Sequence, residues 1–183
     1  MGTRNLTVVF MDGEYKVAQY GQWDGYPEGQ GMTCLKFLKE EFVEDKFRTN
    51  MRKLKMVRTK EERDALDILY KDTVPAEFDR DTGAEILNMI QDGEVKSGFL
   101  SDSIWFAACG DCEWVWVIDL DNRTFEAYQG WNRTRLTADD RFYFLGNYRD
   151  NMYCPAKIVR RWNLSGLPTE KEFLEAFQGE DDD

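Results

Sequence analysis

Histidine is absent from this 183-residue chain, which removes the commonest general base and the commonest metal ligand. Chemistry would therefore rest on carboxylates, thiols or hydroxyls. Two carboxylates held about 5–9 Å apart can catalyse hydrolysis as an acid and a base or nucleophile. The candidate pairs are Asp24 with Glu28, and Glu113 with Asp119, Asp121 or Glu126. Carboxylates in turns and at strand ends are mostly solvated, so these pairs do not identify a catalytic residue.

Cysteine supplies a second possibility. Cys109 and Cys112 have the C-x-x-C spacing of redox pairs, in which a helix N-terminus activates one thiol, but here the motif lies between predicted strands. A zinc site would need two further ligands, and Cys34 and Cys154 form no second pair. We expect ordinary reduced thiols, with no metal ion and no cofactor.

An N-terminal nucleophile is a third possibility. Hydrolases of that type begin their catalytic strand with Cys, Ser or Thr carrying a free amine. Removal of Met1 would expose Gly2 and leave Thr3 one residue too far from the end. The early hairpin suits that architecture, but the nucleophile does not.

The element around which these residues are organised is the loop of residues 19–31. It is rich in glycine, which allows backbone conformations that other residues adopt only with strain. It also carries five side chains suited to binding: Gln22, Trp23, Asp24, Tyr26 and Glu28. Ordered loops of this kind often carry function, although aromatic residues in a tight connection can equally cap the core. We expect Trp23 to pack against the strand of residues 113–119.

Alternating apolar residues and turn signals predict the strands. Asp12-Gly13 is a strong hairpin signal between the first two, and Asp121-Asn122 marks a later turn. The predicted strands span residues 5–10, 15–20, 104–108, 113–119, 124–128, 142–145 and 157–162.

Apolar stripes and caps predict helices between and after these strands. Thr33 is expected to cap the first helix, and residues 44–92 to be mostly helical. Three capping boxes pair Thr59 with Glu62, Thr82 with Glu85, and Thr169 with Glu172. The order of elements predicts an α+β fold: a mostly antiparallel sheet, a helical insertion between two strand regions and a C-terminal helix. We expect one domain over residues 1–179 and an acidic disordered tail over residues 180–183.

Charge limits the class of partner. The 35 acidic residues exceed the 24 basic ones, giving a net charge of −11. This argues against direct binding to nucleic acid or to an anionic membrane, and favours basic protein surfaces. A basic block at residues 46–60 is interpreted as a solvated helical face, with a docking patch as the alternative. No signal peptide or membrane-spanning run is apparent, so we expect a cytoplasmic protein.

Three motifs carry a resemblance. They are Met-Gly-Thr-Arg-Asn-Leu at residues 1–6, Ala-Gln-Tyr-Gly-Gln-Trp-Asp-Gly-Tyr-Pro-Glu-Gly-Gln-Gly at 18–31 and Cys-Glu-Trp-Val-Trp-Val-Ile-Asp-Leu-Asp at 112–121. Together they resemble a family found in phages, mobile elements and some fungi. The resemblance implies a mobile-element accessory protein and carries over no catalytic residue. Small acidic proteins of that setting include anti-CRISPR inhibitors, some of which occupy sites meant for nucleic acid.

These observations lead to one functional hypothesis and two alternatives. The hypothesis is a non-enzymatic acidic protein that binds a basic surface, such as that of a nucleic-acid-binding defence nuclease, and inhibits it. The first alternative is a small-molecule or nucleotide pocket walled by Trp23, Tyr26, Trp114 and Trp116. The second is a carboxylate-based or N-terminal-nucleophile-like hydrolase. Asp119 and Asp121 are further binding candidates, although the glycine and distal Glu of a calcium loop are missing.

Overall fold

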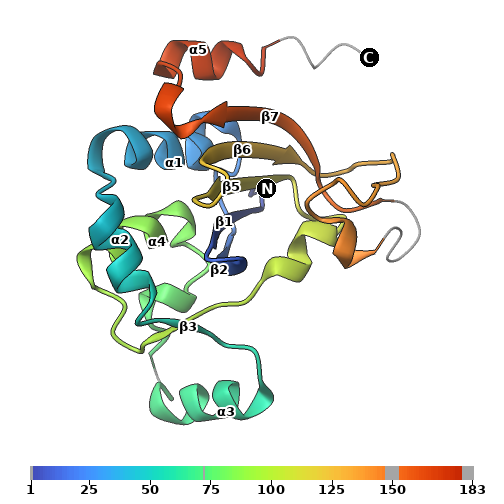
Figure 1. Ribbon diagram of the computed structural model, residues 1–183. Helices are drawn as coiled ribbons and strands as arrows, with labels where there is room; N and C mark the ends of the chain where they lie inside the picture. The colour runs from blue at the N-terminus through green and yellow to red at the C-terminus, as the bar shows by residue number, and fades with distance from the viewer. Residues whose placement is uncertain (1, 72, 147–152, 179–183) are drawn as a thin grey trace.

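A five-stranded mixed sheet forms the centre of the protein (Figure 1). The computed structural model describes residues 2–71, 73–146 and 153–178. The strand order is β2-β1-β5-β6-β7, and all pairs are antiparallel except β1 with β5. Two short strands, β3 and β4, pair in parallel apart from this sheet. The strands are β1 (Asn5–Met11), β2 (Glu14–Gly21), β3 (Lys55–Met56), β4 (Phe99–Leu100), β5 (Trp114–Asp119), β6 (Thr124–Gln129) and β7 (Lys157–Asn163).

Most helices follow β2 and precede β5, as the α+β prediction requires. The first is a continuous helical segment in which α1 is flanked by π-helical turns at Pro27–Gly31 and Phe37–Glu41. The helices are α1 (Met32–Lys36), α2 (Glu44–Met51), α3 (Lys60–Leu69), α4 (Ile86–Asp92) and the C-terminal α5 (Glu170–Glu175). The fold class is therefore confirmed, with the helical insertion between the two strand regions.

Strand β1 lies inside the sheet and is buried on both faces. Val9 and Met11 contribute to the core beneath the helices, whereas Leu6 and Val8 contribute to a second core on the opposite face. A strand covered on both sides needs apolar residues at successive positions rather than in strict alternation. This requirement accounts for the apolar sequence of β1.

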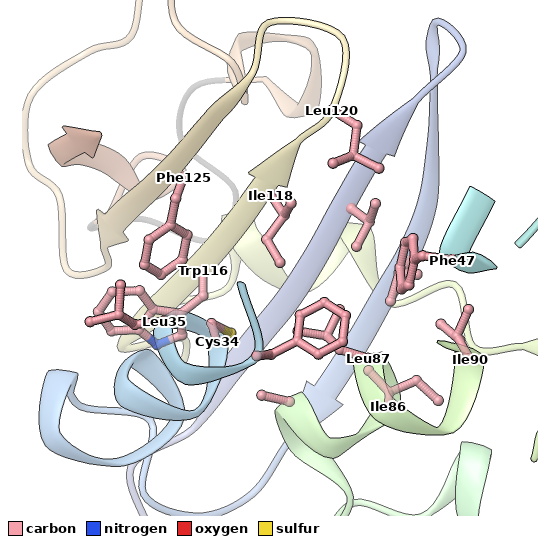
Figure 2. Close-up of a cluster of buried hydrophobic side chains, with 14 of the residues drawn as sticks. Cys34, Leu35, Phe47, Ile86, Leu87, Ile90, Trp116, Ile118, Leu120 and Phe125 are labelled. Carbon is pink, nitrogen blue, oxygen red and sulfur yellow. The ribbon is translucent and has the colours of Figure 1, made fainter. Parts of the chain in front are cut away.

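The larger core fills the space between the sheet and helices α1, α2, α4 and α5. Figure 2 shows Trp116 and Ile118 of β5 pointing from the sheet towards Leu35 of α1 and Leu87 of α4. All four side chains are almost completely buried. At one end of this core, α5 places Phe173 close to the ring of Trp116.

The second core is smaller and is covered by short 3₁₀-helical segments rather than by α-helices. The expectation of strands at residues 104–108 and 142–145 is wrong, because Ile104–Ala108 and Tyr143–Leu145 are 3₁₀-helical. Their apolar residues turn onto the sheet instead of pairing in it. Phe106 packs edge-on against Tyr20, and Phe142 against Tyr128.

Two of the three predicted capping boxes are confirmed. Thr59 and Thr169 each accept a hydrogen bond from the backbone of the glutamate three residues on, and that glutamate bonds back to the cap. The Asp12-Gly13 hairpin is also confirmed, since both residues have positive φ and join β1 to β2.

The capping box predicted at Thr82 and the separate cap predicted at Thr33 are wrong. The hydroxyl of Thr82 donates to the Ala76 carbonyl instead of capping a helix, and Thr82 itself has helical backbone angles. Thr33 lies inside the first helical segment, where its hydroxyl bonds the Gly29 carbonyl. Helix entry comes earlier, at Pro27, whose fixed φ suits a first helical position.

In the part of the chain that the structure describes, no helix has the length and apolar character needed to cross a bilayer. The acidic tail expected at residues 180–183 lies outside the described residues.

Candidate functional site

The inner side of the 19–31 loop is fastened to the sheet by two buried side chains. The indole N–H of Trp116 donates to the Gly25 carbonyl at 2.8 Å. The side-chain amide of Asn5 donates to the carbonyls of Gly21 and Trp23, each at 3.2 Å. The contacts of the loop with the core are thus made mainly by its backbone.

Further hydrogen bonds fix the backbone of the loop. The backbone amide of Gln22 donates to the Arg80 carbonyl at 2.9 Å, and the backbone amide of Gln30 donates to the Asp24 carbonyl at 2.7 Å. The side-chain oxygen of Gln30 then accepts the Ala84 amide at 2.7 Å. The loop is therefore linked both to itself and to the segment before α4.

Close backbone packing explains the glycines at two positions. A Cβ on Gly31 would lie 2.5 Å from the Trp116 ring, and one on Gly29 would lie 2.1 Å from the Asp24 carbonyl oxygen. Asp24 itself has φ +53°, which is uncommon for a residue with a side chain. A strained residue of this kind persists only where its surroundings fix it.

The outer side of the loop presents aromatic and acidic groups to solvent. Trp23 is 45% exposed and Tyr26 40%. The Trp23 indole N–H donates to Asp81 at 2.8 Å, and the Tyr26 hydroxyl donates to Asp24 at 3.0 Å. Donation to the Asp24 carboxylate raises the pKa of Tyr26. Glu28 is exposed beside them in the sequence. We call Gln22, Trp23, Asp24, Tyr26, Glu28 and Asp81 the loop surface.

The expectation that Trp23 packs against β5 is wrong. Its ring lies beside Gly2, and almost half of its surface is in solvent. The contact with β5 is made by Gly31, whose missing side chain leaves room for the Trp116 ring. Asp81 was missed altogether, because nothing local in the sequence indicates a contact with Trp23 58 positions away.

Trp114 and Trp116 do not join the loop aromatics in a pocket. Their rings stack with centroids 5.5 Å apart, and Phe177 packs edge-on against both. Trp116 has no exposed surface, so its ring cannot stack with a ligand. Both residues belong to the core beneath α5.

Asp121 and Asp119 stabilise the turns at the far end of the sheet. The Asp121 carboxylate accepts the backbone amides of Asp12 and Gly13 and so joins one hairpin turn to the other. Asp119 accepts the amides of Asp121 and Asn122 in its own turn.

Asp119 also belongs to a cluster of buried charges on the sheet face away from the helices. Arg141 lies between two carboxylates, with its guanidinium donating to Asp119 and to Glu126, the latter at 2.9 Å. Glu126 additionally accepts the Tyr128 hydroxyl at 2.6 Å and Arg161 at 2.9 Å. Asp119 and Glu126 are almost fully buried.

This cluster lines a hollow of about 530 Å³, but its electrostatics do not suit a general acid. Burial favours the neutral acids, yet hydrogen bonds from Arg141 and Asn122 outweigh it and lower the pKa of Asp119. Burial is likewise outweighed at Glu126, where Tyr128 and Arg141 lower the pKa. A general acid at neutral pH needs a raised pKa. The arrangement therefore supports a structural ion-pair network.

This network predicts that the protein loses stability in acid. Both carboxylates have a folded-state pKa below the unfolded value, so their contribution is complete above about pH 5 and is lost as the pH falls through the lowered folded-state pKa values. Urea unfolding across this range should show a free energy of unfolding that decreases with pH, and Glu126→Gln should reduce that slope. Stability that stays constant below pH 4.5 would contradict the assignment.

The cysteines are free thiols. Cys34, Cys112 and Cys154 are buried, whereas Cys109 is half-buried. Burial raises the pKa of Cys34 to about 12, because its charged form would be desolvated. Within residues 2–71, 73–146 and 153–178, no group of three or more Cys, Asp and Glu side chains is placed to hold a metal ion.

Comparisons with known proteins add no relative: no family model, no curated protein and no solved structure matches the chain. The functional argument therefore rests on the geometry of the loop surface.

Proposed function

We propose that the protein is a non-enzymatic binding protein whose loop surface docks on a basic surface of a partner protein. The observation that carries the proposal is that the backbone of the 19–31 loop is fixed to the sheet while aromatic side chains of the same loop face solvent. Its backbone is fastened to Trp116 and Asn5, while the side chains of Trp23 and Tyr26 remain 45% and 40% exposed.

Rigidity favours binding by such a loop. A flexible loop must be ordered when it binds, which offsets part of the interaction energy. Here the hydrogen bonds at Gly25 and Gln30 fix the loop in the free protein. Trp23 and Tyr26 are thus held in position before any partner arrives.

The chemistry of the loop surface favours a cationic partner. Exposed Trp and Tyr residues are common binding hot spots, and both can receive a Lys or Arg side chain over the ring. Among the described residues, the Glu28 carboxylate has no hydrogen-bond or ion-pair partner, and the Asp24 carboxylate accepts a hydrogen bond through only one of its oxygens. These acceptors remain available to a partner's cations.

The basic block is less available for docking than the sequence suggests. Arg48 and Arg52 both pair with Asp12, and Lys46 pairs with Asp92 at 2.6 Å. Acidic neighbours therefore balance much of this positive charge, which supports the solvated-face interpretation.

The partner class that we propose is a nucleic-acid-binding nuclease. A groove that binds phosphates carries clustered Lys and Arg residues, and an acidic loop with aromatic anchors can occupy such a groove in place of nucleic acid. Inhibition would then follow from competition, without any chemistry by this protein.

We expect Trp23→Ala to weaken binding to a susceptible nuclease by about 2 kcal/mol or roughly 30-fold, as for a hot-spot aromatic. Reversal of charge in Asp24→Lys/Glu28→Lys should weaken binding and remove most of its salt dependence. Calorimetric titration at two salt concentrations, with nucleic acid as a competitor, measures both effects.

Matched controls lie elsewhere on the surface. Phe144 is 57% exposed and contacts Tyr15 at the opposite end of β2, so Phe144→Ala removes an exposed aromatic without touching the loop surface. Glu61→Lys/Asp67→Lys reverses two exposed charges on α3. The proposal fails if the loop variants bind as the controls do.

A further inference from the structure

The segment Cys109-Gly110-Asp111-Cys112 forms a hydrogen-bonded turn immediately before β5. The Cys112 amide donates to the Cys109 carbonyl at 3.0 Å. A turn closed by this bond holds the Cα atoms of its first and fourth residues within about 7 Å. Disulfides span Cα separations of about 4.4–6.8 Å, so the backbone places the two cysteines at a bridgeable separation.

The two thiols have different environments. Cys109 is half-buried and can meet a small molecule in solvent, whereas Cys112 has no exposed surface. Burial raises the pKa of Cys112, and the neighbouring Cys109 raises it further. The Cys112 thiol donates weakly to the Trp114 carbonyl at 3.6 Å. One thiol is thus accessible for attack, and the other is protected behind it.

The turn is held in place on both sides. Asp111 forms an ion pair with Arg4 at 2.9 Å. On the other side, Tyr153 covers the turn so closely that a Cβ on Gly110 would lie 3.2 Å from its ring. A fixed turn keeps the two cysteines together while a bridge forms or opens.

We propose that Cys109 and Cys112 are a redox-sensitive pair that forms a reversible intramolecular disulfide by exchange with a low-molecular-weight disulfide such as glutathione disulfide. The Cys109 thiolate attacks one sulfur of that disulfide, forming a mixed disulfide and releasing one glutathione thiolate. Cys112 then loses its proton to solvent and attacks the Cys109 sulfur, releasing the second glutathione. Two protein thiols are oxidised and one small disulfide is reduced to two thiols.

The pair makes the turn before β5 respond to the thiol–disulfide balance of its surroundings. This role is independent of the loop surface, because neither cysteine contributes a side chain to it. Either proposal can therefore fail without the other.

Mass spectrometry of the intact protein in defined glutathione buffers tests the pair. In oxidising buffer, the folded wild type should lose two hydrogens and gain no glutathione, and reducing buffer should reverse the change. Peptide mapping should link Cys109 to Cys112. In Cys112→Ser the resolving thiol is missing, so one glutathione should remain on Cys109.

Cys154 provides the critical comparison. The Ala156 amide bonds the Ala107 carbonyl, and Tyr153 lies on Gly110, so the segment that carries Cys154 lies beside the Cys109 turn. Cys154→Ser should still form the disulfide, whereas Cys109→Ser should form none. The proposal is overturned by a link between Cys109 and Cys154, a stable glutathione adduct on the wild type, or no change in mass. Circular dichroism checks that each variant is folded, and the wild-type peptide map decides the question without any variant.

Discussion

Replacement of Arg141 by methionine is expected to lower the free energy of unfolding by about 3–5 kcal/mol, the usual cost of breaking a buried ion pair by removing one partner. Arg141 is the shared donor for Asp119 and Glu126, whose side chains are almost inaccessible to solvent. Without the guanidinium, two negative charges would face each other in a poorly solvated space. Because a domain is typically stable by only 5–15 kcal/mol, the variant should unfold at markedly lower urea concentration.

Arg161→Met is the matched control for this experiment. Arg161 donates to the same Glu126 at 2.9 Å, but its side chain is 58% exposed. Water screens an ion pair of that kind, and its removal should cost less than about 1 kcal/mol. Equal losses from Arg141→Met and Arg161→Met would show that burial does not set the strength of the network.

A similarly large effect is expected from Trp116→Ala, which should cost about 3–5 kcal/mol by opening a cavity in the larger core. The Trp116 ring has no exposed surface and lies close to Phe125 and Phe173. Gly31 of the 19–31 loop also packs directly against this ring. The loss should therefore combine weakened packing with release of the 19–31 loop.

Trp116→Phe separates these two contributions. Phenylalanine keeps most of the apolar contact but cannot donate to the Gly25 carbonyl. We expect a loss of about 1–3 kcal/mol, and faster amide hydrogen exchange at Gly25 and Gln30 than at the centre of β1. If exchange in the loop is unchanged, the indole hydrogen bond does not fix the loop surface.

The parts of the fold that follow from local chemistry could be predicted from the sequence. The Asp12-Gly13 turn needs positive φ at two residues, and the capping boxes at Thr59 and Thr169 satisfy backbone amides within one helical turn. Neither depends on distant residues. The box at Thr82 was wrong because Ala76, six positions earlier, accepts its hydroxyl.

Long-range packing explains the other errors. Residues 104–108 and 142–145 are apolar enough for strands, but their side chains join the second core and cover one face of the sheet instead. Trp116 belongs to the core because α5, far along the chain, brings Phe173 against it. A single sequence does not reveal which face of β5 that helix covers.

For the candidate site, the sequence indicated the loop but not its surroundings. Glycine and aromatic content marked residues 19–31, whereas the contact between Trp23 and Asp81 depends on the tertiary fold. The buried network left one readable signal: Glu126 and Tyr128 share one face of β6, opposite the face that carries Phe125 and Ala127. Its shared cation, Arg141, lies in a segment with no strand or helix pattern to place it.

The parallel pairing of β1 with β5 has a consequence for how the protein is made. Asn5 pairs with Trp114, so the first strand leaves the ribosome long before its central neighbour exists. At a synthesis rate of about 5–20 residues per second, the β1–β2 hairpin waits on the order of 5–20 s with an apolar edge unpaired. Non-local pairing of this kind also slows folding, because the entropy of closing the loop between β1 and β5 is lost before the contacts between the two strands form. We therefore expect the nascent chain to be most prone to aggregation while the helical insertion is being synthesised. That period ends when β5, residues 114–119, becomes available to pair with β1.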